Sequence, residues 1–148
     1  MTETAPAYLD LARAAQRGLR VLVVDDHPVN RQILTLTLER IPAKTECAEN
    51  GAEAVETFAA EPFDLVLMDL RMPVMDGFAA MRRIRALEES RGNPRTPIIV
   101  CSAHTTPMDL ARAEEAGADR HLGKPLHIPT LLEAMDAVLA APEEPAAG

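Results

Sequence analysis

Apolar residues follow two kinds of pattern along the chain: short continuous runs, and longer stretches with helical spacing. The clearest runs are Val21–Val24 and Asp64–Asp69, which are typical of strands covered on both faces. The polar stretch 88–97 is rich in Gly, Asn and Pro and is predicted to be a loop. The expected strands cover about 21–24, 44–48, 64–69, 98–101 and 119–122, and the expected helices cover about 28–41, 52–60, 78–87, 108–116 and 128–139.

The segment after the first strand has the apolar spacing of a helix. Its apolar positions Val29, Ile33, Leu36 and Ile41 recur at roughly helical spacing. Pro28 precedes them, and proline is acceptable in the first turn of a helix. The pattern therefore predicts a helix directly after the first strand.

Strands that alternate with helices predict a parallel sheet, because each parallel neighbour needs a crossover connection. Right-handed crossovers place helices on both faces, so the fold class is α/β, a doubly wound sandwich. In such folds a site forms outside the carboxyl ends of the strands. The side chains that could converge there are Asp25, Asp26, Asp69, Ser102 and Lys124.

Four segments surround these residues: VLVVDD, DLVLMDLRMPVMDG, PIIVCSA and GADRHLGKP. Aspartates at strand ends and Lys-Pro pairs are common, so any one segment alone is weak evidence. Together, in this order and over about Arg20 to Leu139, the segments resemble the receiver domains of response regulators and hybrid histidine kinases. The resemblance implies a flavodoxin-like (βα)5 fold, whose five-stranded parallel sheet has the order 2-1-3-4-5.

The acidic residues have a chemical reason to share a site. The carboxylates of Asp25, Asp26 and Asp69 would repel one another without a counter-ion. A divalent cation, Mg²⁺ or Mn²⁺, removes that repulsion, and Mg²⁺ prefers oxygen ligands in octahedral geometry. The resemblance implies that Asp26, Asp69 and the backbone carbonyl of Arg71 bind it directly, while Asp25 acts through a metal-bound water.

The resemblance also implies that Asp69 is the phosphoacceptor. Its carboxylate would attack phosphorus in line, from a phosphohistidine or a small phosphodonor, to form an acyl phosphate. Lys124 would oppose the negative charge on the transferring oxygens. Pro125 would fix the lysine loop, and in the family the peptide bond before it is commonly cis. Ser102 would hydrogen-bond a phosphoryl oxygen and pull the loop after the fourth strand inward.

His121 departs from the family pattern. Receivers usually carry Tyr or Phe at this position of the fifth strand, as a rotating partner to the movement at Ser102. An imidazole is smaller than a phenol ring and can titrate near neutral pH. We hypothesise that output here depends less on aromatic burial or responds to protonation. Identical phosphorylation-induced shifts in wild type and His121→Phe at two pH values would count against this.

Several of these residues also have simpler interpretations. Asp25 and Asp26 could cap the first helix, because aspartate before a helix satisfies free backbone N–H groups. His27 and His104 lie near the predicted site but are interpreted as surface or hydrogen-bonded residues and are not assigned to the metal. Lys124 could be an ordinary solvated lysine. The residues interpreted as structural are Asn30, Asp76, Gly77, Met68, Met72, Met75 and Met81.

Composition limits the class of protein. The 148 residues suit one domain, and 47% apolar against 3% aromatic residues predicts an aliphatic core. A net charge of −8 argues against direct nucleic-acid binding. Cys47 and Cys101 lie in expected strands without metal-ligand spacing, so they are predicted to be buried free thiols. The absence of a membrane-spanning stretch or signal peptide predicts a soluble, cytoplasmic protein.

The chain is predicted to divide into three parts. Residues 1–19 form an N-terminal extension or linker, in which 7–19 can be read as a short amphipathic helix. Residues 20–140 form the receiver domain. Residues 141–148, rich in Ala, Pro and Glu, form a flexible tail too short for a DNA-binding module.

Two outputs fit a receiver: a stand-alone regulator, or a segment of a hybrid histidine kinase that feeds a histidine phosphotransfer protein. The segments DDHPVNRQIL and MDLRMPVMDGF resemble hybrid kinases more. Expected partners are a histidine kinase or phosphotransfer protein and a downstream protein, which would contact helices 108–116 and 128–139 and the strand between them; a homodimer is also possible.

Two other classes of protein share part of this pattern, and neither is a simple phosphoacceptor. An aspartyl-phosphate hydrolase of the haloacid dehalogenase type needs a second Asp two residues after the nucleophile, where this chain has Arg71. A receiver-like module that works without phosphorylation would not need the intact acidic set and lysine. The chain is therefore expected to accept a phosphoryl group rather than to turn over a substrate.

Overall fold

Strands and helices alternate along the whole of the chain that the computed structural model describes, which is residues 19–41, 43–103 and 106–140. In chain order the elements are β1 (Leu19–Val24), α2 (Pro28–Leu38), β2 (Ala43–Ala48), α3 (Gly51–Ala60), β3 (Leu65–Met68), α4 (Gly77–Arg91), β4 (Ile98–Ser102), α5 (Pro107–Ala116), β5 (Arg120–Gly123) and α6 (Ile128–Ala140). The predicted alternation of strands and helices is confirmed.

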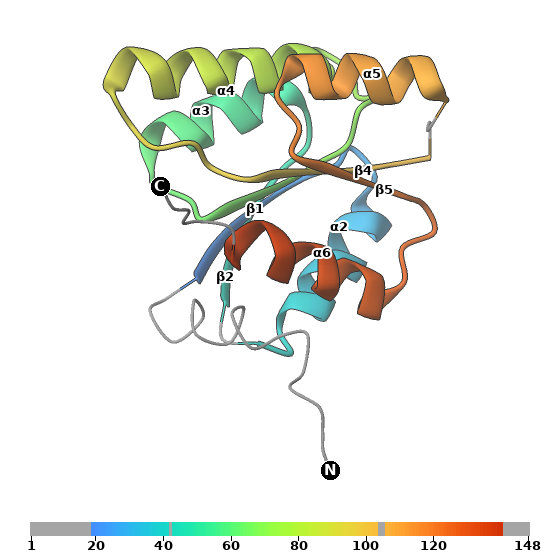
Figure 1. The fold of residues 1–148 in the computed structure, drawn as a ribbon. Coiled ribbons are helices and arrows are strands. Elements are labelled where there is room, and N and C mark those ends of the chain that lie inside the picture. Colours follow the sequence, from blue (N-terminus) through green and yellow to red (C-terminus); the bar gives the residue numbers. More distant parts are fainter. Residues whose placement is uncertain (1–18, 42, 104–105, 141–148) are drawn as a thin grey trace, which may run out of the picture.

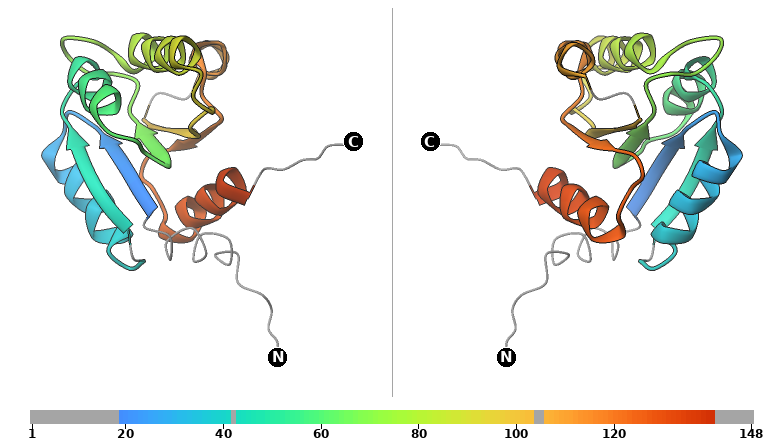
Figure 2. Two further views of the ribbon diagram at one scale, coloured as in Figure 1. Left: turned by 90° about the vertical axis from the view of Figure 1, so that its left-hand side faces the viewer. Right: turned by 90° about the vertical axis from the view of Figure 1, so that its right-hand side faces the viewer.

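The strands form one parallel sheet in the order β2-β1-β3-β4-β5. Helices α3, α4 and α5 cover one face, and α2 and α6 cover the other, as Figures 1 and 2 show. This is the doubly wound architecture and the strand order that the sequence predicted. All the strands point the same way, so the loops that follow them gather at one edge of the sheet.

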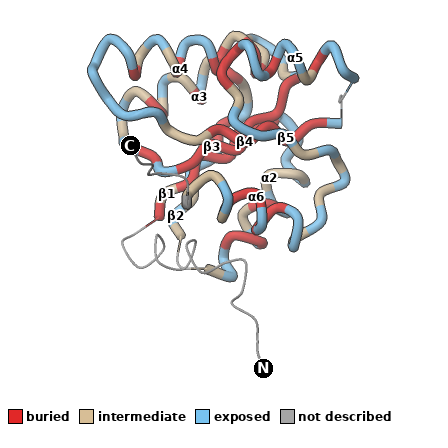
Figure 3. The backbone as a smooth tube through the Cα atoms, in the orientation of Figure 1, coloured by how far each residue is buried: buried red, intermediate tan, exposed pale blue. Residues whose placement is uncertain are grey.

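The core lies in two layers, one on each side of the sheet. Leu22 and Val24 of β1 pack into the layer under α3, α4 and α5, whereas Val21 and Val23 pack into the layer against α2 and α6. This division follows from the alternation of side chains along a strand. Figure 3 shows the buried residues concentrated along the central strands. A rigid sheet therefore supports the loops at its carboxyl edge.

Helix α2 buries a different face from the one the sequence indicated. Leu34, Thr37 and Leu38 are its buried residues. Val29, Ile33 and Leu36 are 53%, 50% and 54% exposed. The helix carries two apolar stripes, and spacing alone does not tell which of them meets the sheet. It also ends earlier than predicted, at Leu38, and Ile41 lies in the following turn.

Helix α4 extends beyond its predicted end, through the residues 88–91 that were interpreted as loop. Glu88 is buried there because it accepts hydrogen bonds from Arg85 Nη1 at 2.9 Å and from Thr96 N at 2.6 Å. Gly92 then ends the helix with a positive φ of 66°, a conformation that suits glycine. The polar residues thus belong to a last helical turn, and the loop begins only at Gly92.

The cysteines differ in environment. Cys101 is buried in β4 as predicted, and desolvation by burial raises the pKa of its thiol to about 12. Cys47 is exposed, which contradicts the prediction. It lies on β2, and β2 is an edge strand of the sheet, so one side of this strand has no neighbour to cover it.

The ends of the domain agree with the prediction only in part. Leu19, assigned to the extension, is the first residue of β1 and is buried. The predicted helical segment before it and the predicted tail 141–148 lie outside the described residues, so this division of the chain stays a prediction. Within the described residues, no helix is long and apolar enough to cross a membrane.

Candidate phosphoacceptor and metal site

Three carboxylates meet at the carboxyl edge of the sheet. Asp25 and Asp26 follow β1, Asp69 follows β3, and one oxygen of each lies within 4.8 Å of the others. Backbone hydrogen bonds fix these strand ends, because Asp69 N donates to Val24 O at 2.9 Å and Asp25 N donates to Ala48 O at 3.1 Å. The acidic cluster that the sequence predicted is therefore present.

The three carboxylates differ in burial and in partners. Asp25 is 1% exposed and Asp69 is 7% exposed, whereas Asp26 is exposed. Asp25 Oδ1 accepts a hydrogen bond from His27 N at 2.9 Å, and Asp69 Oδ1 accepts one from Leu70 N at 2.8 Å. The N-cap residue of α2 is His27, without a side-chain capping bond, so neither aspartate caps the helix by the alternative considered above.

Lys124 links the two buried carboxylates. Its Nζ lies 2.7 Å from Asp25 Oδ2 and 3.5 Å from Asp69 Oδ2. The side chain is only 18% exposed, so the interpretation as an ordinary solvated lysine is wrong. The lysine loop is joined to β4 because Lys124 N donates to Ser102 O at 3.0 Å. The Lys124–Pro125 peptide bond is cis, as the resemblance implied.

The electrostatics of the cluster favour a bound cation. Burial raises the pKa of Asp69 above its ordinary value; the Lys124 charge opposes this shift, and the Asp25 charge adds to it. Burial alone would lower the pKa of Lys124, but its hydrogen bond to Asp25 and the charges of Asp69 and Asp25 outweigh burial and raise it. The single ammonium of Lys124 thus contacts the carboxylates of both Asp25 and Asp69. The cluster therefore keeps an excess of negative charge.

Arg71 offers a further oxygen, that of its backbone carbonyl. Among the described residues, its backbone carbonyl accepts no hydrogen bond, although it lies only two residues after Asp69. Carboxylate and carbonyl oxygens are the ligands that Mg²⁺ uses in proteins. The chemistry of this set of donors therefore fits a small divalent cation.

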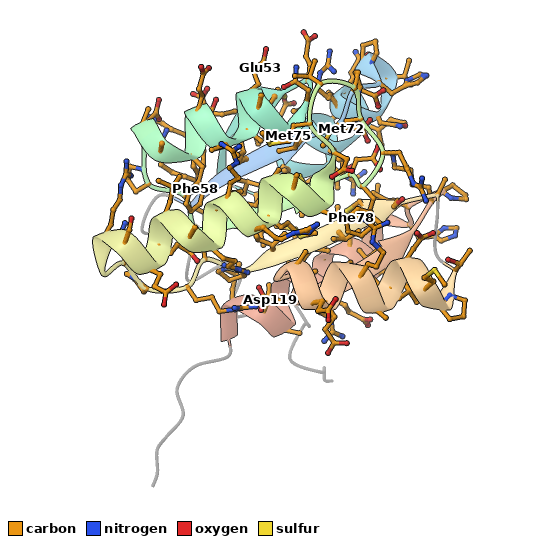
Figure 4. All side chains as sticks on the ribbon, turned by 90° about the horizontal axis from the view of Figure 1, so that it is seen from above. Glu53, Phe58, Met72, Met75, Phe78 and Asp119 are labelled. Atoms are coloured by element: carbon orange, nitrogen blue, oxygen red, sulfur yellow. The ribbon has the colours of Figure 1, made fainter. Side chains whose placement is uncertain are left out.

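The loop between β3 and α4 folds tightly against the end of β3. Gly77 N donates to Leu70 O at 2.9 Å, and a Cβ at Gly77 would collide with the backbone carbonyl of Asp69. Asp76 caps α4 by accepting from Ala79 N at 2.9 Å. Met72 and Met75 pack against the core layer that contains Phe78 (Figure 4). The predicted structural roles of these methionines and of the Asp76–Gly77 turn are confirmed.

Ser102 and His121 lie on the neighbouring strands β4 and β5. Ser102 is the fully buried last residue of β4 and pairs with Gly123. His121 is exposed on β5, opposite Val100, and does not belong to the acidic cluster. Ala103 after the serine is exposed, whereas His104 lies outside the described residues.

Two features were missed by sequence reasoning. The Arg71 guanidinium forms an ion pair with Asp109 on α5, with Nη2 at 3.1 Å from Oδ1. The exposed stripe on α2 was interpreted as packing surface. No local signal relates residues 71 and 109, but the two apolar stripes on α2 could have suggested that one of them faces outward.

The sequence matches the family model described as the response regulator receiver domain over residues 21–136. Among curated proteins, it is 37% identical over 123 residues to the sensory/regulatory protein RpfC of Xanthomonas campestris. That alignment covers 83% of this chain but only 17% of RpfC. The chain therefore spans about a sixth of the length of this relative.

Solved structures agree with the sequence comparison. The receiver domain of sensor histidine kinase PA1611 from Pseudomonas aeruginosa, which holds a magnesium ion in its active site cleft, matches with a TM-score of 0.76 and 31% identity, over 84% of this chain and 99% of that one. A Saccharomyces cerevisiae complex of the histidine phosphotransfer protein Ypd1 with the receiver domain of Ssk1 matches with a TM-score of 0.73 and 30% identity, over 77% of this chain and 83% of that one.

Proposed function

This chain belongs to the response regulator receiver domain family, and from that premise we propose that Asp69 is its phosphoacceptor, modified in a Mg²⁺-dependent reaction (or with Mn²⁺). The domain is a receiver of a two-component phosphorelay. The observation that carries the assignment to Asp69 is the convergence of Asp25, Asp26 and Lys124 on this one side chain. Asp69 Oδ1 accepts a hydrogen bond from Leu70 N, and its Oδ2 lies 3.5 Å from the Lys124 ammonium.

Asp69 is the nucleophile in this mechanism. One of its carboxylate oxygens forms a bond to phosphorus, and the P–N bond of the phosphohistidine breaks. The imidazole, whose other ring nitrogen carries a proton, leaves as a neutral group with the bonding electron pair. The product is an acyl phosphate on Asp69. The Lys124 ammonium opposes the negative charge on the transferring oxygens and on the product.

The other residues hold the cation. Asp26, Asp69 and the Arg71 carbonyl are the proposed direct ligands, while Asp25 acts through a water molecule and anchors Lys124. When bound, the cation neutralises charge on the phosphoryl oxygens and orients the group for in-line transfer. The magnesium ion in the related PA1611 receiver supports this part of the proposal.

We propose that each chain accepts one phosphoryl group and does not turn over a substrate. The phosphoryl group ends on the protein's own side chain, so each chain accepts one group until the acyl phosphate is hydrolysed. A hydrolase of the haloacid dehalogenase type would need an acid/base carboxylate at position 71, and a guanidinium there cannot take up a proton. Its ion pair with Asp109 further argues against that role.

Ser102 and His121 are the proposed switch residues. Ser102 ends β4, and α5 begins at Pro107, a few residues later. A hydrogen bond from Ser102 to a phosphoryl oxygen would therefore act on the start of α5. His121 is exposed on β5 beside that helix, which supports a changed surface over α5, β5 and α6 as the signal to a downstream protein partner.

The proposed phosphodonor is a histidine kinase or histidine phosphotransfer protein, which would meet the domain in the cytoplasm, where kinases find ATP. The proposed docking surface for it is the exposed apolar face of α2, the helix that follows Asp25 and Asp26. Val29, Ile33 and Leu36 are exposed at i, i+4 and i+7, so they share one face of the helix. Such a stripe fits an apolar helical face on the partner. The Ypd1 complex with a related receiver supports a partner of this class.

Ile33→Glu is expected to slow phosphoryl transfer from a phosphorylated histidine phosphotransfer protein by about tenfold or more. Burying the exposed half of an isoleucine contributes about 1 kcal/mol to docking, and a glutamate there adds a cost of desolvation. Ser90→Glu introduces the same charge at an exposed position of α4, on the opposite face of the sheet from α2, and serves as control. Quench-flow measurement with the protein donor should separate the variants, while acetyl phosphate should modify both at the wild-type rate. Equal rates with the protein donor would contradict docking on α2.

The modified residue can be identified by chemical trapping. Borohydride reduces an aspartyl phosphate to homoserine, so peptide mapping of the phosphorylated, reduced protein should find homoserine at position 69. Trapping at any other aspartate would overturn the assignment of the phosphoacceptor.

A further inference from the structure

Asp109 lies on the first turn of α5 and forms contacts outside its own helix. Its side chain is only 10% exposed. Oδ2 accepts a hydrogen bond from Thr106 Oγ1 at 2.9 Å, and Thr106 Oγ1 in turn accepts one from Asp109 N at 3.1 Å. This exchange closes the N-terminus of the helix and resembles a capping box. The capping interaction uses Oδ2 of Asp109, and Oδ1 takes no part in it.

The second oxygen of Asp109 holds Arg71. Arg71 Nη2 donates to Asp109 Oδ1 at 3.1 Å, from a position 38 residues earlier in the chain. Among the described residues, the backbone of Arg71 forms no hydrogen bond, and Asp109 is the only polar partner of its side chain. Arg71 is thus attached to the rest of the domain at α5.

An ion pair between two solvated side chains would contribute little. This pair differs, because one partner is almost buried and already fixed by the capping bond. The Arg71 side chain is 54% exposed, so most of the entropy cost of the pair comes from ordering this one side chain. The contact therefore fixes a loop residue against a rigid helix.

We propose that Asp109 is a positioning residue for the metal site, because it holds Arg71 and thereby the loop whose carbonyl is offered to the cation. The inference rests on the function proposed above, in which the Arg71 carbonyl is a ligand. It also couples the site to α5, since any cation that favours this loop conformation favours the Arg71–Asp109 pair by the same factor. The start of α5 is thus linked to the site through a side chain as well as through the segment after Ser102.

A double-mutant cycle on Mg²⁺ binding tests this inference. Amide chemical shifts of the full chain would be followed in an NMR titration with MgCl₂ for wild type, Arg71→Met, Asp109→Asn and the double variant. Each single variant is expected to raise the Kd for Mg²⁺ by about fivefold, the lower range of typical coupling between sites. The double variant should match the single ones, because both remove the same contact.

Arg112→Leu is the matched control. Arg112 is also on α5 and lies over the ring of Phe78 at 4.0 Å, so it joins α5 to α4 without touching the metal loop. Its removal is expected to loosen α5 and leave the Kd for Mg²⁺ at the wild-type value. Arg71→Met changes an exposed side chain and leaves the cap of α5 intact, so the test stands even if Asp109→Asn fails to fold.

The outcomes separate this inference from the proposed function. If wild type binds no Mg²⁺, the proposed function fails first. If wild type binds Mg²⁺ and Arg71→Met leaves the Kd unchanged, the positioning role is wrong while the metal site stands. The inference would be overturned if the effects of Arg71→Met and Asp109→Asn on the Kd for Mg²⁺ were additive. It would also be overturned if Arg112→Leu raised this Kd equally, because the contact would then only support α5 in general.

Discussion

Lys124→Met is expected to lower the free energy of unfolding by about 3 kcal/mol and to slow phosphorylation about a hundredfold. The stability loss follows from the 2.7 Å contact with Asp25, a side chain that is only 1% exposed. Breaking a buried ion pair by removing one partner leaves an uncompensated charge and costs about 3–5 kcal/mol. The rate loss follows from removing a positive charge placed where negative charge develops.

The experiment compares urea unfolding and phosphorylation by acetyl phosphate in Lys124→Met and Lys44→Met. Lys44 is exposed on β2, so its loss should change the free energy of unfolding by less than about 0.5 kcal/mol. Added Mg²⁺ should stabilise Lys124→Met more than wild type, because a cation replaces the missing charge. Indistinguishable unfolding curves for the two lysine variants would show that Lys124 is not part of the acidic site.

The pH dependence of this loss is determined by the sign of the pKa shift. The pKa of Lys124 is raised above its ordinary value of 10.5, so the stability it contributes is complete below pH 10.5. That contribution is lost only as the pH rises further, through the higher folded-state pKa. The deficit of Lys124→Met should therefore be constant across neutral pH.

Asp69→Asn is expected to raise the melting temperature of the metal-free protein at pH 7 by a few degrees while abolishing its stabilisation by Mg²⁺. Burial raises the pKa of Asp69, so ionising this side chain costs free energy in the folded state. The neutral amide of the Asp69→Asn variant removes that cost, and it also removes a proposed ligand of Mg²⁺. The metal-free wild-type protein is thus expected to be less stable than the inactive Asp69→Asn variant. Such a loss of stability is common where function requires several like charges close together.

The gain in melting temperature of Asp69→Asn should depend on pH and on the burial of the carboxylate that is replaced. The gain should fade as the pH falls through the folded-state pKa of Asp69 to its ordinary value of 3.8, because below 3.8 the carboxyl is protonated in both states. Asp26→Asn should also lose the stabilisation by Mg²⁺, but with little gain in the metal-free protein, since Asp26 is exposed. Thermal unfolding with EDTA and with Mg²⁺ measures both effects; a Mg²⁺ response retained in Asp69→Asn would contradict the ligand assignment.

The sheet and the acidic site could be predicted because both follow from strand ends. Runs such as Val21–Val24 stop at aspartates, and parallel strands carry their carboxyl ends to one edge. The family's motifs then added Lys124, whose partner Asp25 lies 99 residues away in the chain. Local pattern and resemblance agreed at these positions, and the structure brings them together.

Other features could not be predicted, because they depend on which surfaces meet. Val29 and Leu34 belong to different apolar stripes of α2, and only packing against the sheet shows that Leu34 is the buried one. Glu88 is a charged residue in a buried helical position, and the hydrogen bonds from Arg85 and Thr96 that stabilise it there cannot be read from the local sequence. The exposure of Cys47 likewise depends on β2 being an edge strand.

The most direct test of Asp69 as phosphoacceptor is intact-mass analysis after incubation with acetyl phosphate, with and without Mg²⁺, for wild type and Asp69→Asn. The account predicts a single phosphoryl adduct on wild type that requires Mg²⁺ and is absent from the variant. A folded wild-type protein that acquires no adduct from acetyl phosphate or a more reactive donor, or a variant that still acquires it, would contradict the account.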